Sequence, residues 1–139
     1  MANNKNQAQD LVKMLRDTVV ALVKGEGPDL SARQLGVFLT CYLDESGHTV
    51  RGLASSLNVS KPAITRALDR LGEFDLARRK VDPLDRRSVL VQRTPKGAAY
   101  LKEICAIMDV TAGKSIESVA QDVSRKVQPV RRRLRVAAA

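Results

Sequence analysis

The segment from Asp82 to Gly97 restricts the fold of this 139-residue chain more than any other. It reads Asp-Pro-Leu-Asp-Arg-Arg-Ser-Val-Leu-Val-Gln-Arg-Thr-Pro-Lys-Gly. A charged turn is followed there by an alternating apolar run at residues 89–93, which is typical of a half-buried strand. We therefore predict a hairpin with strands near 76–81 and 89–93, whose exposed tip is formed by residues 82–87.

The charge of the chain is concentrated around this turn. The chain has 24 Lys and Arg against 15 Asp and Glu, a net charge of +9. Residues 51–100 hold eleven basic and five acidic side chains, whereas residues 1–50 hold five and six. This distribution favours a localised polyanion-binding face over a generally basic surface. The adjacent Arg86 and Arg87 suit a phosphate backbone or the narrow groove of a duplex.

Most of the remaining chain has helical periodicity. Aromatic residues make up only 3% of the chain and Trp is absent, so the core must be aliphatic. Apolar residues recur three or four apart in five stretches, which predicts five helical regions. These are residues 7–24, 31–44, 50–57, 60–71 and 98–128, after a loose end at 1–6. The predicted fold class is mainly α with a small β-hairpin.

The short helix at 50–57, the tight turn Asn58-Val59 and the helix capped by Ser60 form a helix-turn-helix pattern. Together with the hairpin they predict a winged helix-turn-helix. The inward stripe of the second helix comprises Ile64, Ala67, Leu68 and Leu71. The rest of that helix would face outward, and a helix of this kind fits the major groove of B-form DNA.

Nine residues are the candidate DNA-binding site. Ser60, Lys61 and the free amides of the first turn suit a phosphate. Arg66 can bind guanine through two hydrogen bonds, and Thr65 can contact a thymine methyl group or a phosphate. The full set is Ser60, Lys61, Pro62, Thr65, Arg66, Arg70, Asp85, Arg86 and Arg87.

Over about residues 30–110 the chain resembles the multiple-antibiotic-resistance regulator (MarR) family of bacterial transcription factors. The matching residues are Leu53-Ala54, Leu57, Val59-Ser60, Ala63-Ile64-Thr65-Arg66, Leu68-Asp69-Arg70-Leu71, Asp82-Pro83-Leu84-Asp85-Arg86-Arg87 and Thr94-Pro95-Lys96-Gly97. The resemblance implies that the helix after Ser60 lies in the major groove and the wing enters the minor groove. It also implies that Asp85 pairs with and orients Arg87, and that Arg86 and Arg87 read the groove.

The resemblance further implies a homodimer joined by helices from both ends of the chain. We expect a single winged helix-turn-helix domain over residues 1–139. Residues 7–29 and 98–128 are its dimerisation helices, and the apolar stripe of the latter exceeds what one small core needs. Residues 30–97 are the DNA-binding core. The basic tail at 129–139, with Arg131–Arg133 and Arg135, is expected to be a solvated end, the alternative being a phosphate-binding extension.

Members of the family often release DNA when a phenolic ligand binds or a cysteine is oxidised. In this chain Phe38 and Tyr42 lie on a predicted central helix, where aromatic side chains are usually core residues. Cys41 and Cys105 have apolar neighbours, where a thiol is typically inert, the alternative for Cys41 being oxidant sensing. No specific role is expected for His48. Whether a small-molecule effector exists stays open.

We therefore expect a sequence-specific transcriptional regulator of double-stranded DNA, acting as a homodimeric repressor on an inverted-repeat operator. The alternative is a winged-helix module that binds protein or RNA. The chain is not expected to be an enzyme, because it has no Gly-rich phosphate loop and only one His to serve a nucleophile as base. Without a CxxC pair, no metal or cofactor is expected. No apolar run nears the roughly 20 residues of a membrane span, so a cytoplasmic location is expected.

Overall fold

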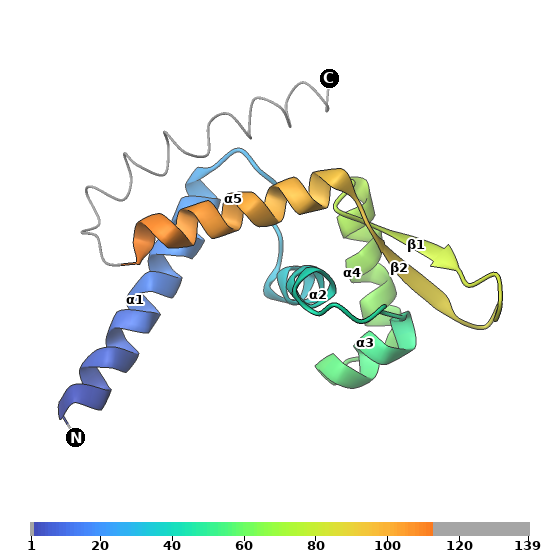
Figure 1. Cartoon of the computed structure of the whole chain (residues 1–139), viewed down its shortest axis with the longest axis horizontal. Coiled ribbons are helices and arrows are strands. Elements are labelled where there is room, and N and C mark those ends of the chain that lie inside the picture. The colour runs from blue at the N-terminus through green and yellow to red at the C-terminus, as the bar shows by residue number, and fades with distance from the viewer. Residues whose placement is uncertain (1, 113–139) are drawn as a thin grey trace. The chain divides into compact units, whose positions relative to one another are not determined.

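The computed structural model of the chain describes residues 2–112, in which five helices and two strands form (Figure 1). They are α1 (Ala2–Lys24), α2 (Ala32–Leu43), α3 (Val50–Leu57), α4 (Lys61–Glu73), β1 (Ala77–Val81), β2 (Val89–Arg93) and α5 (Pro95–Thr111). The chain divides into two compact units, with the boundary inside α5. One unit comprises residues 30–101, and the described part of the other comprises residues 2–29 and 102–112.

Helix α2 is the central helix of the unit at 30–101, as its broad apolar set predicts. It begins at a capping box, in which the Ser31 hydroxyl accepts from the Gln34 amide and the Gln34 side chain accepts from the Ser31 amide. Phe38 is fully buried, and its ring centroid lies 4.5 Å from that of Tyr42 and 5.3 Å from that of Tyr100. The prediction that Phe38 and Tyr42 are core residues is confirmed.

The turn between α3 and α4 is closed by backbone geometry and two caps. The Thr49 hydroxyl accepts from the Gly52 amide at the start of α3. Asn58 ends α3 in the left-handed conformation, with φ 53° and ψ 47°, which Asn tolerates better than most residues. The Ser60 hydroxyl accepts from the Ala63 amide and begins α4.

One side of α4 is buried and the other is exposed, as the sequence predicts. Its buried residues are Ala63, Ile64, Ala67, Leu68 and Leu71. The helix ends where Asp75 adopts φ 56° and the Leu76 amide donates to the Leu71 carbonyl, 2.9 Å away. This left-handed residue turns the chain from the end of α4 into β1.

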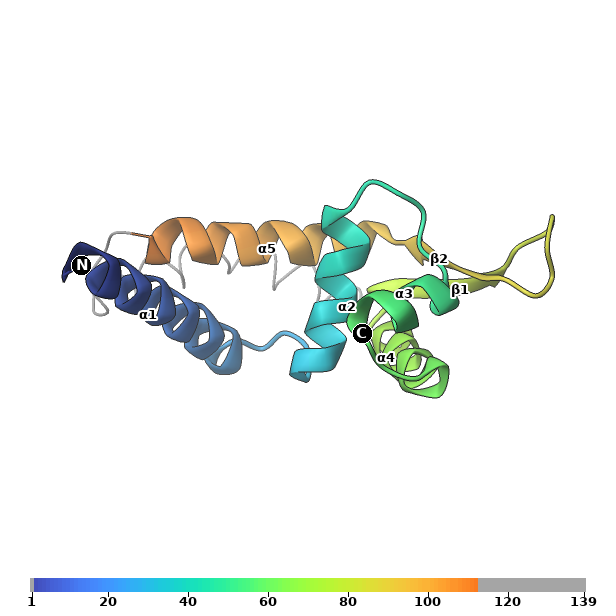
Figure 2. The ribbon, with the colours of Figure 1, turned by 90° about the horizontal axis from the view of Figure 1, so that it is seen from below.

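The two strands form the predicted antiparallel hairpin, in a register that pairs Ala77 with Arg93 and Val81 with Val89. The loop between the strands lies beyond the helices of its unit in both views (Figures 1 and 2). In addition to its pairing with β1, strand β2 forms an isolated antiparallel bridge, in which Leu90 pairs with Thr49. The residue directly before α3 therefore also pairs with the wing.

In the other unit, the last turns of α5 pack against α1. Ile107 and Val110 are buried there against Ala21 and Leu22. Helix α1 begins at Ala2, so the prediction of a loose end is wrong for residues 2–6. Neither Gly nor Pro interrupts the chain before Gly25, and the helix therefore continues toward the N-terminus.

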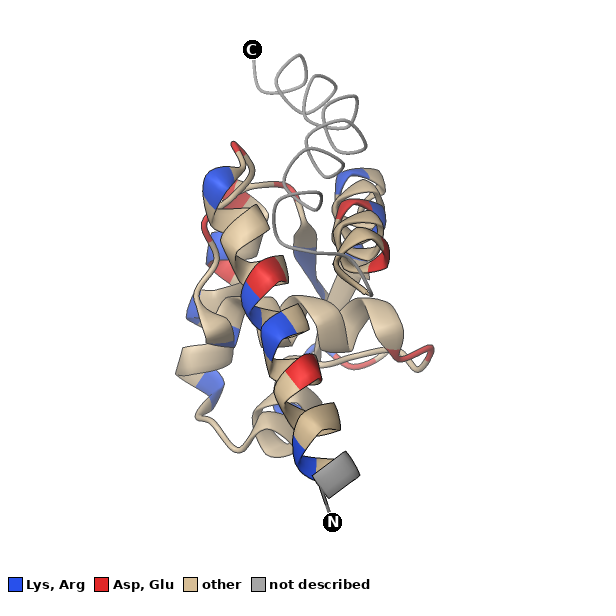
Figure 3. Ribbon diagram, turned by 90° about the vertical axis from the view of Figure 1, so that its left-hand side faces the viewer, with Lys and Arg blue, Asp and Glu red and all other residues tan. Residues whose placement is uncertain are grey.

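Helix α1 also leaves apolar side chains exposed. Leu11, Leu15, Val19 and Val23 follow one another at intervals of four, which places them on one side of the helix. They are between 44% and 72% exposed. Acidic and basic positions are interspersed along the rest of the helix (Figure 3). An uncovered apolar side of this kind is typical of an interaction surface.

Among residues 2–112, no helix has both the length and the hydropathy that crossing a bilayer requires. The same residues contain no group of three His, Cys, Asp or Glu side chains placed to hold a metal ion. The later part of the predicted dimerisation stretch, residues 113–128, and the basic tail at 129–139 lie outside the described residues.

Candidate nucleic-acid interface

The start of α4 exposes two cationic side chains and a proline to solvent. Lys61, Pro62 and Arg66 are exposed, and Thr65 is partly buried. Neither Lys61 nor Arg66 has an ion-pair partner within residues 2–112. The Ser60 hydroxyl is occupied in capping the Ala63 amide, at 3.2 Å. An anion at this helix end would meet the positive end of the helix dipole and the Lys61 ammonium.

Two carboxylates shape the tip of the wing by accepting from the main chain. Asp82 Oδ1 accepts from the Leu84 amide at 2.9 Å, and Asp85 Oδ1 accepts from the Arg87 amide at 3.1 Å. Asp85 Oδ2 also lies 3.4 Å from the Ser88 hydroxyl, which donates to it. The Asp82 amide donates to the Ser88 carbonyl at 2.9 Å and closes the loop. These are the local side-chain bonds that fix turns.

The expected pairing of the Asp85 carboxylate with the Arg87 guanidinium does not form in the structure. Instead the carboxylate accepts from the Arg87 main chain, because a short acidic side chain reaches the amide two residues ahead more easily than a guanidinium. Arg86 and Arg87 are exposed and have no ion-pair partner among the described residues. Asp85 therefore positions the arginines through the backbone of the loop.

Three other arginines of this region are already neutralised by carboxylates. The ion pairs are Arg79–Asp69, Arg70–Glu73 and Arg78–Asp75, with N···O distances of 2.5, 2.6 and 2.8 Å. The first pair joins α4 to β1, and the Arg70 guanidinium also lies 4.7 Å from the centroid of the Phe74 ring. Arg70, a candidate site residue, is therefore held at the last turn of α4.

Every carboxylate between residues 61 and 93 consequently has a local partner. Three accept from arginines, and two accept from main-chain amides of the wing tip. The basic side chains without a partner in the described residues of this region are Lys61, Arg66, Lys80, Arg86 and Arg87. The positive potential of this region is thus carried by the start of α4 and by the wing.

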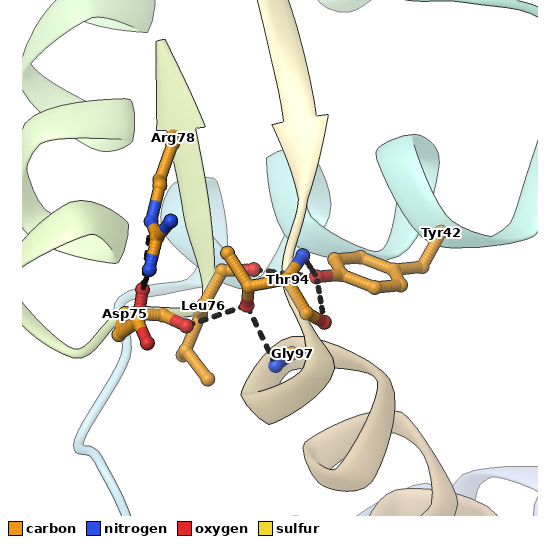
Figure 4. Close-up of polar contacts among 6 residues, drawn as sticks. All are labelled: Tyr42, Asp75, Leu76, Arg78, Thr94 and Gly97. Carbon is orange, nitrogen blue, oxygen red and sulfur yellow. Dashed lines mark hydrogen bonds and ion pairs between the residues drawn. The ribbon is translucent and has the colours of Figure 1, made fainter.

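A hydrogen-bonded latch holds the root of the wing (Figure 4). The Tyr42 hydroxyl donates to the Leu76 carbonyl at 2.7 Å and accepts from the Thr94 amide at 2.9 Å. The Thr94 hydroxyl in turn donates to the Asp75 carbonyl at 2.6 Å and accepts from the Gly97 amide at 2.9 Å. The latch joins α2, both ends of the hairpin and the start of α5.

Gly97 lies where no side chain fits. A Cβ atom at this position would overlap the Tyr42 hydroxyl and the Leu76 carbonyl oxygen. The Thr94-Pro95-Lys96-Gly97 segment is therefore explained by packing: Thr94 bonds across the hairpin root, and Gly97 allows the tyrosine to approach.

Arg93 fixes the other side of the hairpin root. Its Nε donates to the Cys41 carbonyl at 2.9 Å, and its Nη2 donates to the Asp44 carbonyl at 2.7 Å. A guanidinium there satisfies carbonyls at the C-terminus of α2 and complements the helix dipole. No local sequence pattern indicates this role for Arg93, because the bonded residues lie about 50 positions earlier in the chain.

The two cysteines have different surroundings. Cys41 is buried, and burial raises the pKa of its thiol from 9.0 to about 11, so the thiol is unreactive near neutral pH. Cys105 is exposed, so burial does not protect its thiol as it protects that of Cys41. Ile104 and Ile107 on the same helix are buried. An open cavity of about 500 Å³ lies beside Cys41, His48 and Arg93.

Comparison with known proteins shows which family model and which solved structures the chain resembles. Residues 30–89 match the sequence model of the MarR family. A comparison with curated proteins gave no match.

Solved structures of similar fold cover nearly the whole chain. A mutant of MepR from S. aureus, bound to an oligodeoxyribonucleotide, has a TM-score of 0.66 at 18% identity and covers 94% of this chain and 96% of its own. A mutant of MarR from E. coli has a TM-score of 0.56 at 23% identity, with 98% and 96% covered. The transcriptional repressor CouR, bound to a DNA duplex, has a TM-score of 0.55 at 22% identity, with 99% and 90% covered.

These likenesses establish the fold, in which the helix pair α3–α4 and the β1–β2 hairpin form a winged helix-turn-helix. The residues matched by the family model contain α2, α3, α4, β1 and the wing tip. Residues 30–89 therefore match the MarR family model, and the fold of the described chain is the one these solved structures share.

Proposed function

We propose that this protein is a transcriptional repressor that binds double-stranded DNA in a sequence-specific manner. The observation that carries the proposal is the distribution of charge. All carboxylates between residues 61 and 93 have local partners, whereas several cations of α4 and the wing have none within the described part of the chain. Two structures of similar fold, those of MepR and CouR, hold DNA. Their DNA-bound state supports a duplex as the partner here.

In this proposal the start of α4 reads the major groove. Arg66 is exposed and has no ion-pair partner among residues 2–112. In this proposal it binds a guanine edge, while Thr65 contacts a thymine methyl group or a phosphate. Pro62 borders the base edges, and Lys61 binds phosphate beside the turn capped by Ser60.

The wing supplies a second contact, in the minor groove. The guanidinium groups of Arg86 and Arg87 enter the minor groove, because its negative potential attracts them. Asp85 contributes by holding the loop in shape. Arg70 contributes little to base reading, because Glu73 and Phe74 hold its guanidinium at the far end of α4.

The protein acts as a homodimer in this proposal, and α1 provides part of the interface. The support is the exposed stripe of Leu11, Leu15, Val19 and Val23, which a second copy can cover. A two-fold dimer presents two copies of α4 to successive major grooves. The operator would then be an inverted repeat with half-sites about one helical turn apart.

Selection of bound sequences from a random duplex pool, together with light scattering, tests the proposal. We expect the selected duplexes to share an inverted repeat, and the particle mass to be twice the chain mass of 15.2 kDa. Bound duplexes without any common sequence would exclude base reading. Absence of duplex binding at moderate salt, with retention of RNA or protein ligands, would favour the interaction module instead.

A further inference from the structure

The tip of the wing carries a large apolar side chain that the proposed function does not use. Leu84 is 95% exposed, whereas the next most exposed large apolar residue among the described side chains, Val23, is 72% exposed. It lies between the two aspartates that shape the loop, Asp82 and Asp85. Single exposed leucines are common on protein surfaces, so exposure alone assigns no role.

The loop holds Leu84 in a defined position. The Leu84 amide donates to Asp82 Oδ1 at 2.9 Å, and the next amide, that of Asp85, donates to the Asp82 carbonyl at 3.3 Å. Pro83, directly before it, fixes its own φ near about −65°. Binding of an apolar group held in this way costs less conformational entropy than ordering a free loop.

The surroundings of Leu84 indicate which partner it fits. Arg86 and Arg87 lie two and three residues further on, exposed and without partners in the described part of the chain. The nearby carboxylates of Asp82 and Asp85 are engaged with main-chain amides. An apolar tip beside two guanidinium groups without partners in the described residues matches a groove with apolar walls and anionic rims. The DNA minor groove, walled by deoxyribose rings and bordered by phosphates, has this chemistry.

We propose that Leu84 is an apolar wedge that enters the minor groove and packs against deoxyribose rings, while Arg86 and Arg87 engage the groove walls. The inference rests on the proposed function, and it adds an interaction that is independent of charge. Because the width of the minor groove depends on the DNA sequence, Leu84 also contributes to the preference for the sequence that flanks the half-site.

The test compares Leu84→Ser with Leu43→Ser, using the full chain and the duplex selected by the wild-type protein. Leu43 is also exposed, at 63%, but lies at the end of α2 and serves as the matched control. We expect Leu84→Ser to weaken duplex binding about tenfold at every salt concentration, because the variant buries less apolar surface against the DNA. The slope of log affinity against log salt stays unchanged, because no ionic interaction is removed. Leu43→Ser binds as the wild type does.

Chemical footprinting shows where on the duplex Leu84 packs. Hydroxyl radicals attack deoxyribose from the minor groove, and the Leu84→Ser complex should regain cleavage at the sugars that the wing protects. Protection of guanine N7 from methylation in the major groove should persist, because α4 is unaltered.

Wild-type affinity in Leu84→Ser would overturn the inference, and so would a salt slope that changes as it does for Arg86→Ala. If Leu84→Ser keeps its affinity for the duplex but no longer binds another protein, Leu84 would be assigned to a protein interface instead. If the wild-type chain selects no duplex, the proposed function fails before this comparison begins.

Discussion

Replacement of Gly97 by alanine should disrupt the latch at the root of the wing. The new Cβ would overlap both the Tyr42 hydroxyl and the Leu76 carbonyl oxygen, and atoms do not approach so closely. The tyrosine must therefore withdraw, and the beginning of β1 must shift.

The size of the effect follows from the hydrogen bonds that the tyrosine gives up. The Tyr42 hydroxyl bonds the Leu76 carbonyl and the Thr94 amide, both in buried surroundings. Each broken bond costs about 1 kcal/mol, and each buried group left without a partner costs about 1–3 kcal/mol. We expect Gly97→Ala to lower the free energy of unfolding by about 3–5 kcal/mol. Gly36→Ala is the control, because its nearest contact would lie at an ordinary 3.7 Å.

Urea denaturation followed by circular dichroism, at one protein concentration, measures these changes. Tyr42→Phe removes the hydroxyl and should cost about 1–3 kcal/mol. In the double mutant Tyr42→Phe/Gly97→Ala the closest clash is relieved, so its cost should be less than the sum of the two single costs. Strict additivity, or a stable Gly97→Ala, would refute the contact between this glycine and the tyrosine.

Four further predictions concern single side chains. Arg66→Ala should weaken binding to the selected duplex by about 1–3 kcal/mol and relax base preference. Arg70→Ala should cost less, because Arg70 is already paired with Glu73. Equal losses of affinity in a binding titration would contradict this assignment. Asp85→Asn should keep its affinity for the duplex, because the amide oxygen can still accept from the Arg87 amide. Asp85→Ala should weaken duplex binding several-fold. Weaker binding by both variants would show that the negative charge itself is needed. A thiol reagent at neutral pH should label Cys105 in the native protein but Cys41 only after denaturation, as mass spectrometry can show. Because the folded state raises the Cys41 pKa from 9.0 to about 11, its contribution to stability is present below pH 9.0 and declines toward pH 11.

Elements whose signals are local could be predicted from the sequence. The buried stripe of α4 follows from apolar residues at intervals of three and four, and its start follows from Ser60 as cap. The hairpin follows from the alternation at 89–93 after a turn rich in Asp and Pro. In each case neighbouring residues decide the structure, and the prediction needs no tertiary information.

Contacts between distant residues could not be predicted in this way. Tyr42 and Thr94 are 52 positions apart, as are Cys41 and Arg93, and only the folded chain brings them together. The bridge between Thr49 and Leu90 is of the same kind. The expected ion pair of Asp85 and Arg87 failed for the opposite reason, because a bond to the adjacent main chain satisfies the carboxylate first.

The affinity of the double mutant Arg86→Ala/Arg87→Ala for the selected duplex tests the central claim most directly. Both side chains are exposed and unpaired among the described residues, so thermal stability should be nearly unchanged. We predict that duplex binding weakens at least several-fold, and that the slope of log affinity against log salt becomes shallower by about 0.9 for each phosphate no longer neutralised. Binding equal to that of the wild type, with an unchanged slope, would contradict the assignment of the wing as a DNA-binding element.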